Sequence, residues 1–106
     1  MRSTYTEVIT QWTESAPYWE KRPDIIRDMF ALVTQALTAD PAITGRDAVL
    51  DVATGPGEPA LSIADLIGSE GKVVGTERVS EMVEAARREG YRRGLYNSVS
   101  SYRWSP

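Results

Sequence analysis

The residues best suited to chemistry lie together near the middle of this 106-residue sequence, at positions 51–57. This stretch, Asp-Val-Ala-Thr-Gly-Pro-Gly, follows a short apolar run and leads into a helical pattern. Gly55 and Gly57 carry no Cβ atom, so the turn can adopt positive φ angles and a ligand can approach its backbone closely. The first N–H groups of the following helix lack partners within that helix. This order of strand, glycine turn and helix is typical of a nucleotide-type site.

An acidic residue lies at a suggestive distance from this turn. Glu77 follows Gly57 by twenty residues and ends the next predicted strand. The carboxyl ends of adjacent parallel strands face the same crevice, so the carboxylate and the turn are expected to meet there. Two carboxylate oxygens can accept hydrogen bonds from both hydroxyls of a ribose. Together the two features predict a ribonucleoside site.

Asp51 narrows the choice of nucleoside. It lies at the end of the strand before the turn, where its carboxylate would repel a pyrophosphate and attract an ammonium group. A ligand with a ribose, an amino group and no phosphate is then needed, and S-adenosylmethionine fits. Gly55 to Ala60 also loosely satisfies the dinucleotide pattern G-x-G-x-x-G/A. A nicotinamide or flavin domain therefore stays as a further alternative, although Asp51 and the missing third glycine weigh against it.

The composition restricts the available chemistry. The chain has no cysteine and no histidine, which excludes disulfides, zinc sites built on these residues and a histidine base. No tight acidic cluster suggests Mg²⁺, so no metal site is expected. The net charge of −3, with both signs mixed along the chain, argues against a nucleic-acid partner. No segment resembles a membrane span or a signal core, so a cytoplasmic protein is expected.

A helical pattern precedes the turn. Apolar residues recur at helical spacing over residues 5–16, and Pro17 is expected to end this helix. Tyr18 and Trp19 would then lie in a connection. Two such rings need a surface to rest on, so we expect them either to cap the core or to close over the ligand turn as a lid.

A second helix is expected to begin near Pro23 and to end at Asp40. Its apolar stripe is expected to pack in the core. The main residues of this stripe are Ile26, Met29, Phe30, Val33 and Leu37.

The rest of the chain is expected to form a β-α-β-α unit. Residues 48–52 read as a strand buried on both faces, and residues 72–76 as a second parallel strand. Between them a helix is expected from Pro59, with Gly68 just after its end. Ser80 is expected to cap a further helix.

The C-terminal part carries weaker signals. Gly90 is expected to end the last helix, and residues 99–104 could form a third strand. Four arginines are expected to form a solvated basic face. They are Arg87, Arg88, Arg92 and Arg93.

Val49–Leu61 resembles the first motif of class I S-adenosylmethionine-dependent methyltransferases, and Val73–Arg87 is similar to the segment that follows it in that family. The type closest in character is the ubiquinone/menaquinone-biosynthesis methyltransferase, in which the string Gly-Glu-Pro-Ala-Leu is familiar. A Trp…Ala-Pro-x-Trp segment is familiar there too, and here it comprises Trp12, Ala16, Pro17 and Trp19. The resemblance covers roughly residues 5–90.

The resemblance implies a Rossmann-like α/β fold that binds S-adenosylmethionine. The turn would line the methionine part, Glu77 would hold the ribose, and Arg78 with Met82 would lie near the adenine. Two departures are the alanine where many members have their first glycine and the glutamate in place of the commoner aspartate. The implied cofactor-binding residues are Asp51, Ala53, Thr54, Gly55, Gly57, Glu77, Arg78 and Met82.

The family fold has a seven-stranded sheet, of which this sequence supplies two strands, or three with the tail. We therefore expect an N-terminal helical segment at residues 1–45 and a partial, truncated cofactor-binding domain at residues 46–106. The strand of residues 48–52 would keep an open apolar edge. We expect self-association through that edge, or completion by another chain.

The expected activity is methyl transfer from S-adenosylmethionine to a small-molecule acceptor of a quinone-like kind. No catalytic base can be assigned from the sequence. The alternative is a non-catalytic cofactor-binding or interaction module with the same fold.

Overall fold

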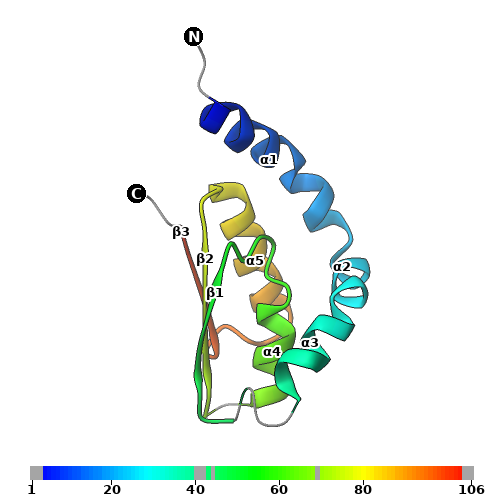
Figure 1. Ribbon diagram of the computed structural model, residues 1–106, viewed down its shortest axis with the longest axis vertical. Helices are drawn as coiled ribbons and strands as arrows, with labels where there is room; N and C mark the ends of the chain where they lie inside the picture. The colour runs from blue at the N-terminus through cyan, green and yellow to red at the C-terminus, as the bar shows by residue number, and fades with distance from the viewer. Residues whose placement is uncertain (1–3, 40–42, 44, 69, 104–106) are drawn as a thin grey trace.

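The computed structural model describes residues 4–39, 43, 45–68 and 70–103. In this part of the chain three parallel strands form one sheet in the order β1-β2-β3. Helices α4 and α5 cover one face of the sheet, and α1, α2 and α3 form an arc beyond them (Figure 1). In chain order the elements are α1 (Thr4–Lys21), α2 (Pro23–Met29), α3 (Ala31–Thr38), β1 (Ala48–Val52), α4 (Ala60–Ile67), β2 (Lys72–Glu77), α5 (Ser80–Arg92) and β3 (Val99–Arg103).

The sheet is covered on one side only in the described structure. Val49, Val73 and Val99 are neighbours in register on the three strands. Their side chains pack against the buried side chains of α4. On the opposite face Leu50 is 63% exposed and Val52 is 72% exposed. The expectation that this strand is buried on both faces is therefore wrong here, because no described element packs on the second face.

The core has two parts. The first lies between α4 and the sheet and is built on Ala60, Ile63, Ala64 and Val73. The second joins α1 to the start of α5 and is built on Ala16, Val79 and Met82, with Ile9 and Trp19 packed against it. The second cluster fixes α1 beside the end of β2, where the predicted ligand turn lies.

Helix α1 does not end at Pro17. The helix continues to Lys21 with the proline inside it, so Tyr18 and Trp19 lie on the helix rather than in a connection. A proline inside a helix removes one backbone donor. The packing of Ala16 and Trp19 against α5 offsets that loss.

The expected second helix is divided at Phe30, which has φ −93° and ψ 2° and separates α2 from α3. Its apolar stripe is mostly exposed, and the two helices contact the rest of the chain mainly through α1 for α2 and through α4 for α3. Ile26 is buried. The exposed large apolar side chains of these two helices are Ile25, Met29, Leu32, Val33 and Leu37.

Helix α5 differs from its prediction at both ends. Ser80 is its first residue and makes no capping bond. The carboxylate of Glu77 accepts the N–H of Val79 instead, at 2.8 Å. Gly90 is buried inside the helix, which continues to Arg92. An added Cβ would lie 3.3 Å from Cδ2 of Leu61, a tight contact that favours glycine at this position.

The tail does form a third strand, β3, paired with β2. Trp104, the last residue of that expectation, lies outside the described residues. Arg87 donates from Nε and Nη2 to the carbonyl of Ser101 and so joins α5 to β3. None of the helices in the described ranges has both the length and the apolar character of a membrane span.

Candidate functional site

The turn between β1 and α4 has the backbone conformation that its glycines suggested. Gly55 has φ +57° and Gly57 has φ +110°. Ala53 shares this left-handed region with φ +59°, which is unusual for a residue with a Cβ atom. An added Cβ at Gly55 would meet nothing within 4 Å, so the space above this glycine is open.

Glu77 and the turn meet, as predicted. The backbone N–H of Gly55 donates to Oε1 of Glu77 at 3.1 Å, and the N–H of Val79 donates to Oε2 at 2.8 Å. The carboxylate is thereby held at the end of β2, facing the turn. Both residues contribute to the lining of one cavity.

Asp51 lies beneath the turn. Its Oδ2 accepts a hydrogen bond from Oγ1 of Thr54 at 2.8 Å. Burial raises the pKa of Asp51 above its ordinary 3.8, the hydrogen bond from Thr54 opposes this, and the nearby charge of Glu77 adds to it. The turn is thus built on two neighbouring carboxylates, a disposition that favours a ligand with a positive charge.

Gly75 is a part of the site that the sequence analysis did not identify. An added Cβ would lie 2.8 Å from Cγ2 of Thr54 and 2.9 Å from its Oγ1. Thr54 is 2% exposed and donates its N–H to the carbonyl of Thr76 at 2.9 Å. The missing side chain lets the turn pack directly on β2. A glycine inside a strand is a recognised sign of such a close approach.

A cavity of about 350 Å³ opens over the turn. Its polar side consists of the turn, Glu58 and Glu77, and its apolar side comes mainly from α1, α2 and the residue between α2 and α3. The rings of Trp12 and Trp19 lie 6.4 Å apart between centroids. The complete lining is Trp12, Trp19, Ile26, Phe30, Ala53, Thr54, Gly55, Pro56, Glu58, Glu77 and Met82.

The predicted site residues fall into two groups. Those that line the cavity are Ala53, Thr54, Gly55, Glu77, Met82 and the candidate lid residue Trp19. The others do not line it: Asp51 lies behind Thr54, to which it is hydrogen bonded, Gly57 is buried against Leu61, and Tyr18 is 77% exposed. Arg78 points elsewhere, since its Nε donates to the hydroxyl of Tyr5 at 2.6 Å and its guanidinium lies over that ring.

Several lining residues were not predicted to belong to the site. Ile26 and Phe30 were assigned only to an apolar helix face, and Trp12 was named in the family segment without a role in the site. How α1 and α2 wrap over the turn is not visible in such patterns. Glu58 was not singled out either. Its acidic side chain directly follows Gly57, a glycine of the predicted turn, and this was the available signal.

The residues present fit an adenosyl sulfonium. The open space above Gly55 admits close approach to the backbone, the two oxygens of Glu77 suit ribose hydroxyls, and the carboxylate of Asp51 suits an ammonium group. The cavity volume lies at the lower end of the range of about 300–1,000 Å³ typical of small-molecule sites.

Comparison with protein families assigns the chain. The family model described as protein-L-isoaspartate(D-aspartate) O-methyltransferase (PCMT) matches residues 9–101, which is most of the sequence. The chain belongs to the PCMT family. This supports the class I methyltransferase resemblance, while the ubiquinone-biosynthesis type stays a prediction. No curated protein matches the chain.

Solved structures share the fold of this chain. A candidate S-adenosyl-L-methionine-dependent methyltransferase from Methanococcus maripaludis aligns over 88% of this chain and 42% of its own, with 14% identity and a TM-score of 0.73. A SAM-dependent methyltransferase from Aquifex aeolicus aligns over 67% of this chain and 37% of its own, with 27% identity and a TM-score of 0.58.

A protein-L-isoaspartate O-methyltransferase aligns over 69% of this chain and 22% of its own, with 26% identity and a TM-score of 0.53. The chain therefore spans less than half the length of each of these three structures. Its Rossmann-like α/β fold is that of S-adenosylmethionine-dependent methyltransferases.

Proposed function

We propose that this protein binds S-adenosylmethionine at the turn of residues 53–57 and takes part in methyl transfer. The observation that carries the proposal is the meeting of Gly55 and Glu77, 3.1 Å apart between amide nitrogen and carboxylate oxygen, at the wall of a cavity. Family membership supports the same reaction class. When bound, the cofactor supplies a methyl group on a sulfonium, ready for transfer.

Each residue of the site has a separate proposed task. Glu77 accepts hydrogen bonds from the ribose hydroxyls, and Asp51 attracts the ammonium group from below the turn. Trp12 and Trp19 cover the opposite side and keep water out. These tasks are alignment and charge placement, which account for much of the rate enhancement in group transfer.

The proposed methyl acceptor is a small, flat, apolar molecule of a quinone-like kind. It would enter along the apolar side of the cavity, formed by Trp12, Trp19, Ile26 and Phe30. Aromatic rings stack favourably on such side chains. A second candidate is the carboxylate of an isoaspartyl residue in a peptide, which the PCMT family description favours.

Calorimetric titration with S-adenosylhomocysteine tests cofactor binding. Gly55→Val is expected to abolish binding because the side chain would occupy the open space above the turn. Gly94→Val is the matched control, since Gly94 also has a positive φ, +72°, and no atom within 4 Å of an added Cβ. Equal binding by both variants, or none by the wild type, would contradict the proposal.

Methyl transfer separates the candidate acceptors. The protein is incubated with radiolabelled S-adenosylmethionine and either a demethylated quinol or an isoaspartyl peptide. Label in the quinol supports the proposed acceptor, and label in the peptide favours the second candidate. Cofactor binding without transfer to either would favour the non-catalytic module.

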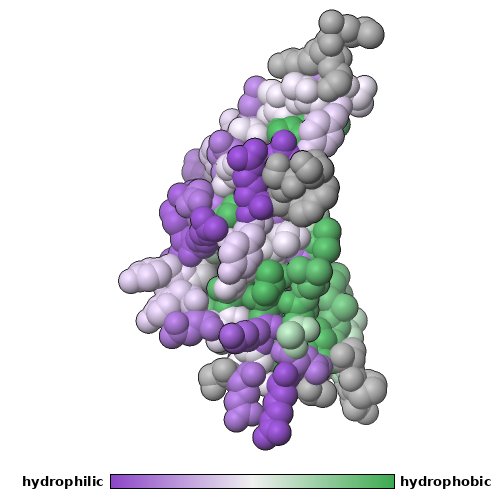
Figure 2. All heavy atoms as spheres, turned by 90° about the vertical axis from the view of Figure 1, so that its left-hand side faces the viewer, coloured by the Kyte–Doolittle hydropathy of each residue, from purple (hydrophilic) through white to green (hydrophobic). Residues whose placement is uncertain are grey.

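We also propose that the open edge of β1 pairs with the same edge of a second copy of this chain. Apolar side chains gather over the uncovered face of the sheet in Figure 2, and Leu50 and Val52 are the most exposed large residues of β1 on that face. In the described structure β1 pairs on one edge only. A two-fold axis through Leu50 would place Ala48 opposite Val52 with no charge on that face of either strand.

Sedimentation measurements over a range of concentrations test this contact. The wild type is expected to dimerise, and Leu50→Lys is expected to be monomeric because a charge at an open strand edge opposes pairing. Leu66→Lys is a matched control on α4, where the leucine is equally exposed at 63%. A monomeric wild type would contradict pairing with a second copy and would favour a different polypeptide.

A further inference from the structure

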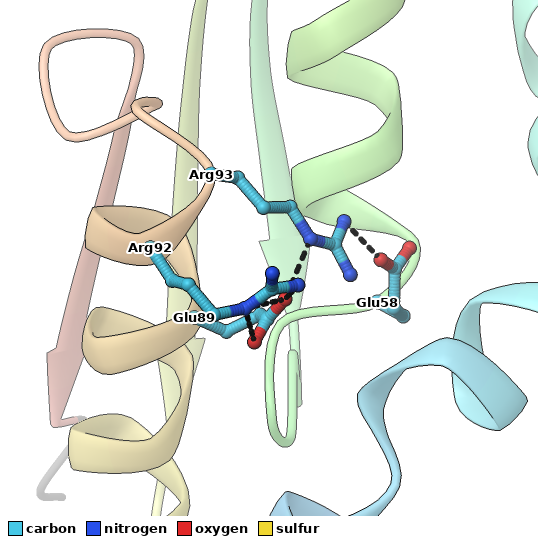
Figure 3. A network of polar contacts seen from close by, with 4 residues as sticks. All are labelled: Glu58, Glu89, Arg92 and Arg93. Atoms are coloured by element: carbon cyan, nitrogen blue, oxygen red, sulfur yellow. Dashed lines mark hydrogen bonds and ion pairs between the residues drawn. The ribbon is translucent and has the colours of Figure 1, made fainter.

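A buried series of charged side chains joins the turn to the far end of α5 (Figure 3). Glu58 directly follows Gly57, and its side chain is 3% exposed. Its Oε1 lies 2.6 Å from Nη1 of Arg93, whose own side chain is 11% exposed. Arg93 closes the C-terminal end of α5, and its Nε donates to Glu89 at 2.8 Å. In Figure 3 its guanidinium extends from the helix end toward Glu58.

Glu58 depends on this one cation. Among the described residues no hydrogen bond reaches either of its carboxylate oxygens, so the ion pair with Arg93 is what balances its charge. A buried carboxylate that loses its partner is strongly unfavourable and tends to move toward water. The position of Glu58 is therefore tied to that of Arg93.

Glu89 keeps Arg93 in place. Burial alone would raise the pKa of Glu89, but hydrogen bonds from Arg92 and Arg93 outweigh it and hold the pKa below its ordinary 4.5. Glu89 thus stays charged at neutral pH. Arg92 binds the same carboxylate from the solvent side and does not reach Glu58.

The same helix holds the turn at its other end. Glu77 accepts the N–H of Gly55 at 3.1 Å and the N–H of Val79, the residue before α5, at 2.8 Å. Gly55 and Glu58 are therefore each anchored to one end of α5. Gly55, Pro56 and Glu58 line the cavity together with Glu77, so most of the segment fixed between these anchors borders it.

We propose that Arg93 is a positioning residue for the ligand turn. Its ion pair with Glu58 holds residues 55–58 in the shape that presents the turn and the carboxylate of Glu77 to a ligand. Without the Arg93 charge Glu58 turns toward water, and the backbone of Gly57 moves with it because the two residues are joined directly. The inference rests on the proposed function only for the identity of the ligand.

The first test needs no ligand. Arg93→Met is compared with Arg92→Met, which removes the exposed neighbouring arginine from the same glutamate. The amide resonances and hydrogen-exchange rates of Gly55 and Gly57 are measured by NMR. Arg93→Met is expected to shift both amides and to speed their exchange, while Arg92→Met leaves them unchanged. Unaltered amides in folded Arg93→Met would overturn the proposal.

The second test measures affinity for S-adenosylhomocysteine. Arg93→Met is expected to weaken binding at least about 10-fold, the lower end of what the loss of an orienting partner costs in metal sites. Arg93→Lys, which keeps the charge, should restore part of the affinity. Wild-type affinity in Arg93→Met would overturn the positioning role. Failure of the wild type to bind would contradict the proposed function alone.

Arg93→Met could lose its fold, since it leaves Glu58 buried and uncompensated. Glu58→Gln avoids this problem because it is neutral and has the same shape. The same two glycine amides are then expected to shift. If Glu58→Gln leaves both amides and the affinity unchanged, Arg93 does not act through Glu58 and the proposal fails.

Discussion

Ala53 occupies a backbone conformation that favours glycine. Its φ of +59° places it in the left-handed region, and its position starts the ligand turn. The family resemblance had marked this residue as an alanine where many members carry glycine. The structure gives that departure a physical meaning, because the alanine keeps the turn geometry at a cost in strain.

Ala53→Gly is expected to stabilise the protein by about 0.5–1 kcal/mol, because relief of left-handed strain exceeds the added freedom of the unfolded chain. Urea unfolding measures the change. Gly68→Ala makes the reverse change at a φ of +81° with open space around the added Cβ, and it should destabilise. A less stable Ala53→Gly variant would contradict the account of strain.

Asp51 links stability to pH. Burial raises its pKa on folding. An acid with a raised folded pKa contributes stability below its unfolded pKa, near 3.8, and loses it as the pH rises through the folded value. Asp51→Asn is therefore expected to be more stable than the wild type at neutral pH, with the difference shrinking below pH 3.8. The urea unfolding midpoints of the wild type and Asp51→Asn are measured at neutral pH and below pH 3.8. A variant that is less stable than the wild type at neutral pH would contradict the prediction.

The residues at the carboxyl ends of the strands were predictable, and those around them were not. Gly55 and Glu77 could be paired from the sequence because a strand, a turn and a second strand bring them together locally. Glu58 and Arg93 could not, since the C-terminal end of α5 reaches the turn only in the packed structure. Arg93 was expected to be solvated with its neighbours and is instead largely buried.

At the scale of elements, local signals placed β1, α4 and β2 correctly to within a residue or two. The errors lie where packing outweighs a local preference. Pro17 stays inside α1 because the helix packs on α5, and Gly90 stays inside α5 because Leu61 lies against it. A single sequence shows the cost of these residues but not the contacts that offset it.

Gly75 shows how one element supports another. Gly75→Ala is expected to destabilise the protein by about 1–3 kcal/mol, the usual cost of overpacking, because Thr54 cannot yield without moving the turn. The free energy of unfolding in urea and the affinity for S-adenosylhomocysteine should both fall. Gly90→Ala adds the same atom beside the flexible end of Leu61 and should cost less. A tolerated Gly75→Ala would show that β2 does not constrain the turn.

For the molecule as a whole, the arrangement is one-sided. The helices lie on one face of the sheet, and the other face leaves apolar side chains of β1 exposed (Figures 1 and 2). Parallel sheets are normally covered on both faces. The sequence indicated an apolar strand, and an apolar composition alone does not show that a second layer packs on it.

The central claim is that the carboxylate of Glu77 and the glycine turn bind the same adenosyl ligand. The most direct measurement is calorimetric titration of the wild type and Glu77→Gln with S-adenosylhomocysteine. Loss of the charged acceptor should weaken binding at least about 10-fold, as expected for a hydrogen bond to a charged group, while the fold persists. Equal affinity in the two proteins, or no binding by a folded wild type, would contradict the account.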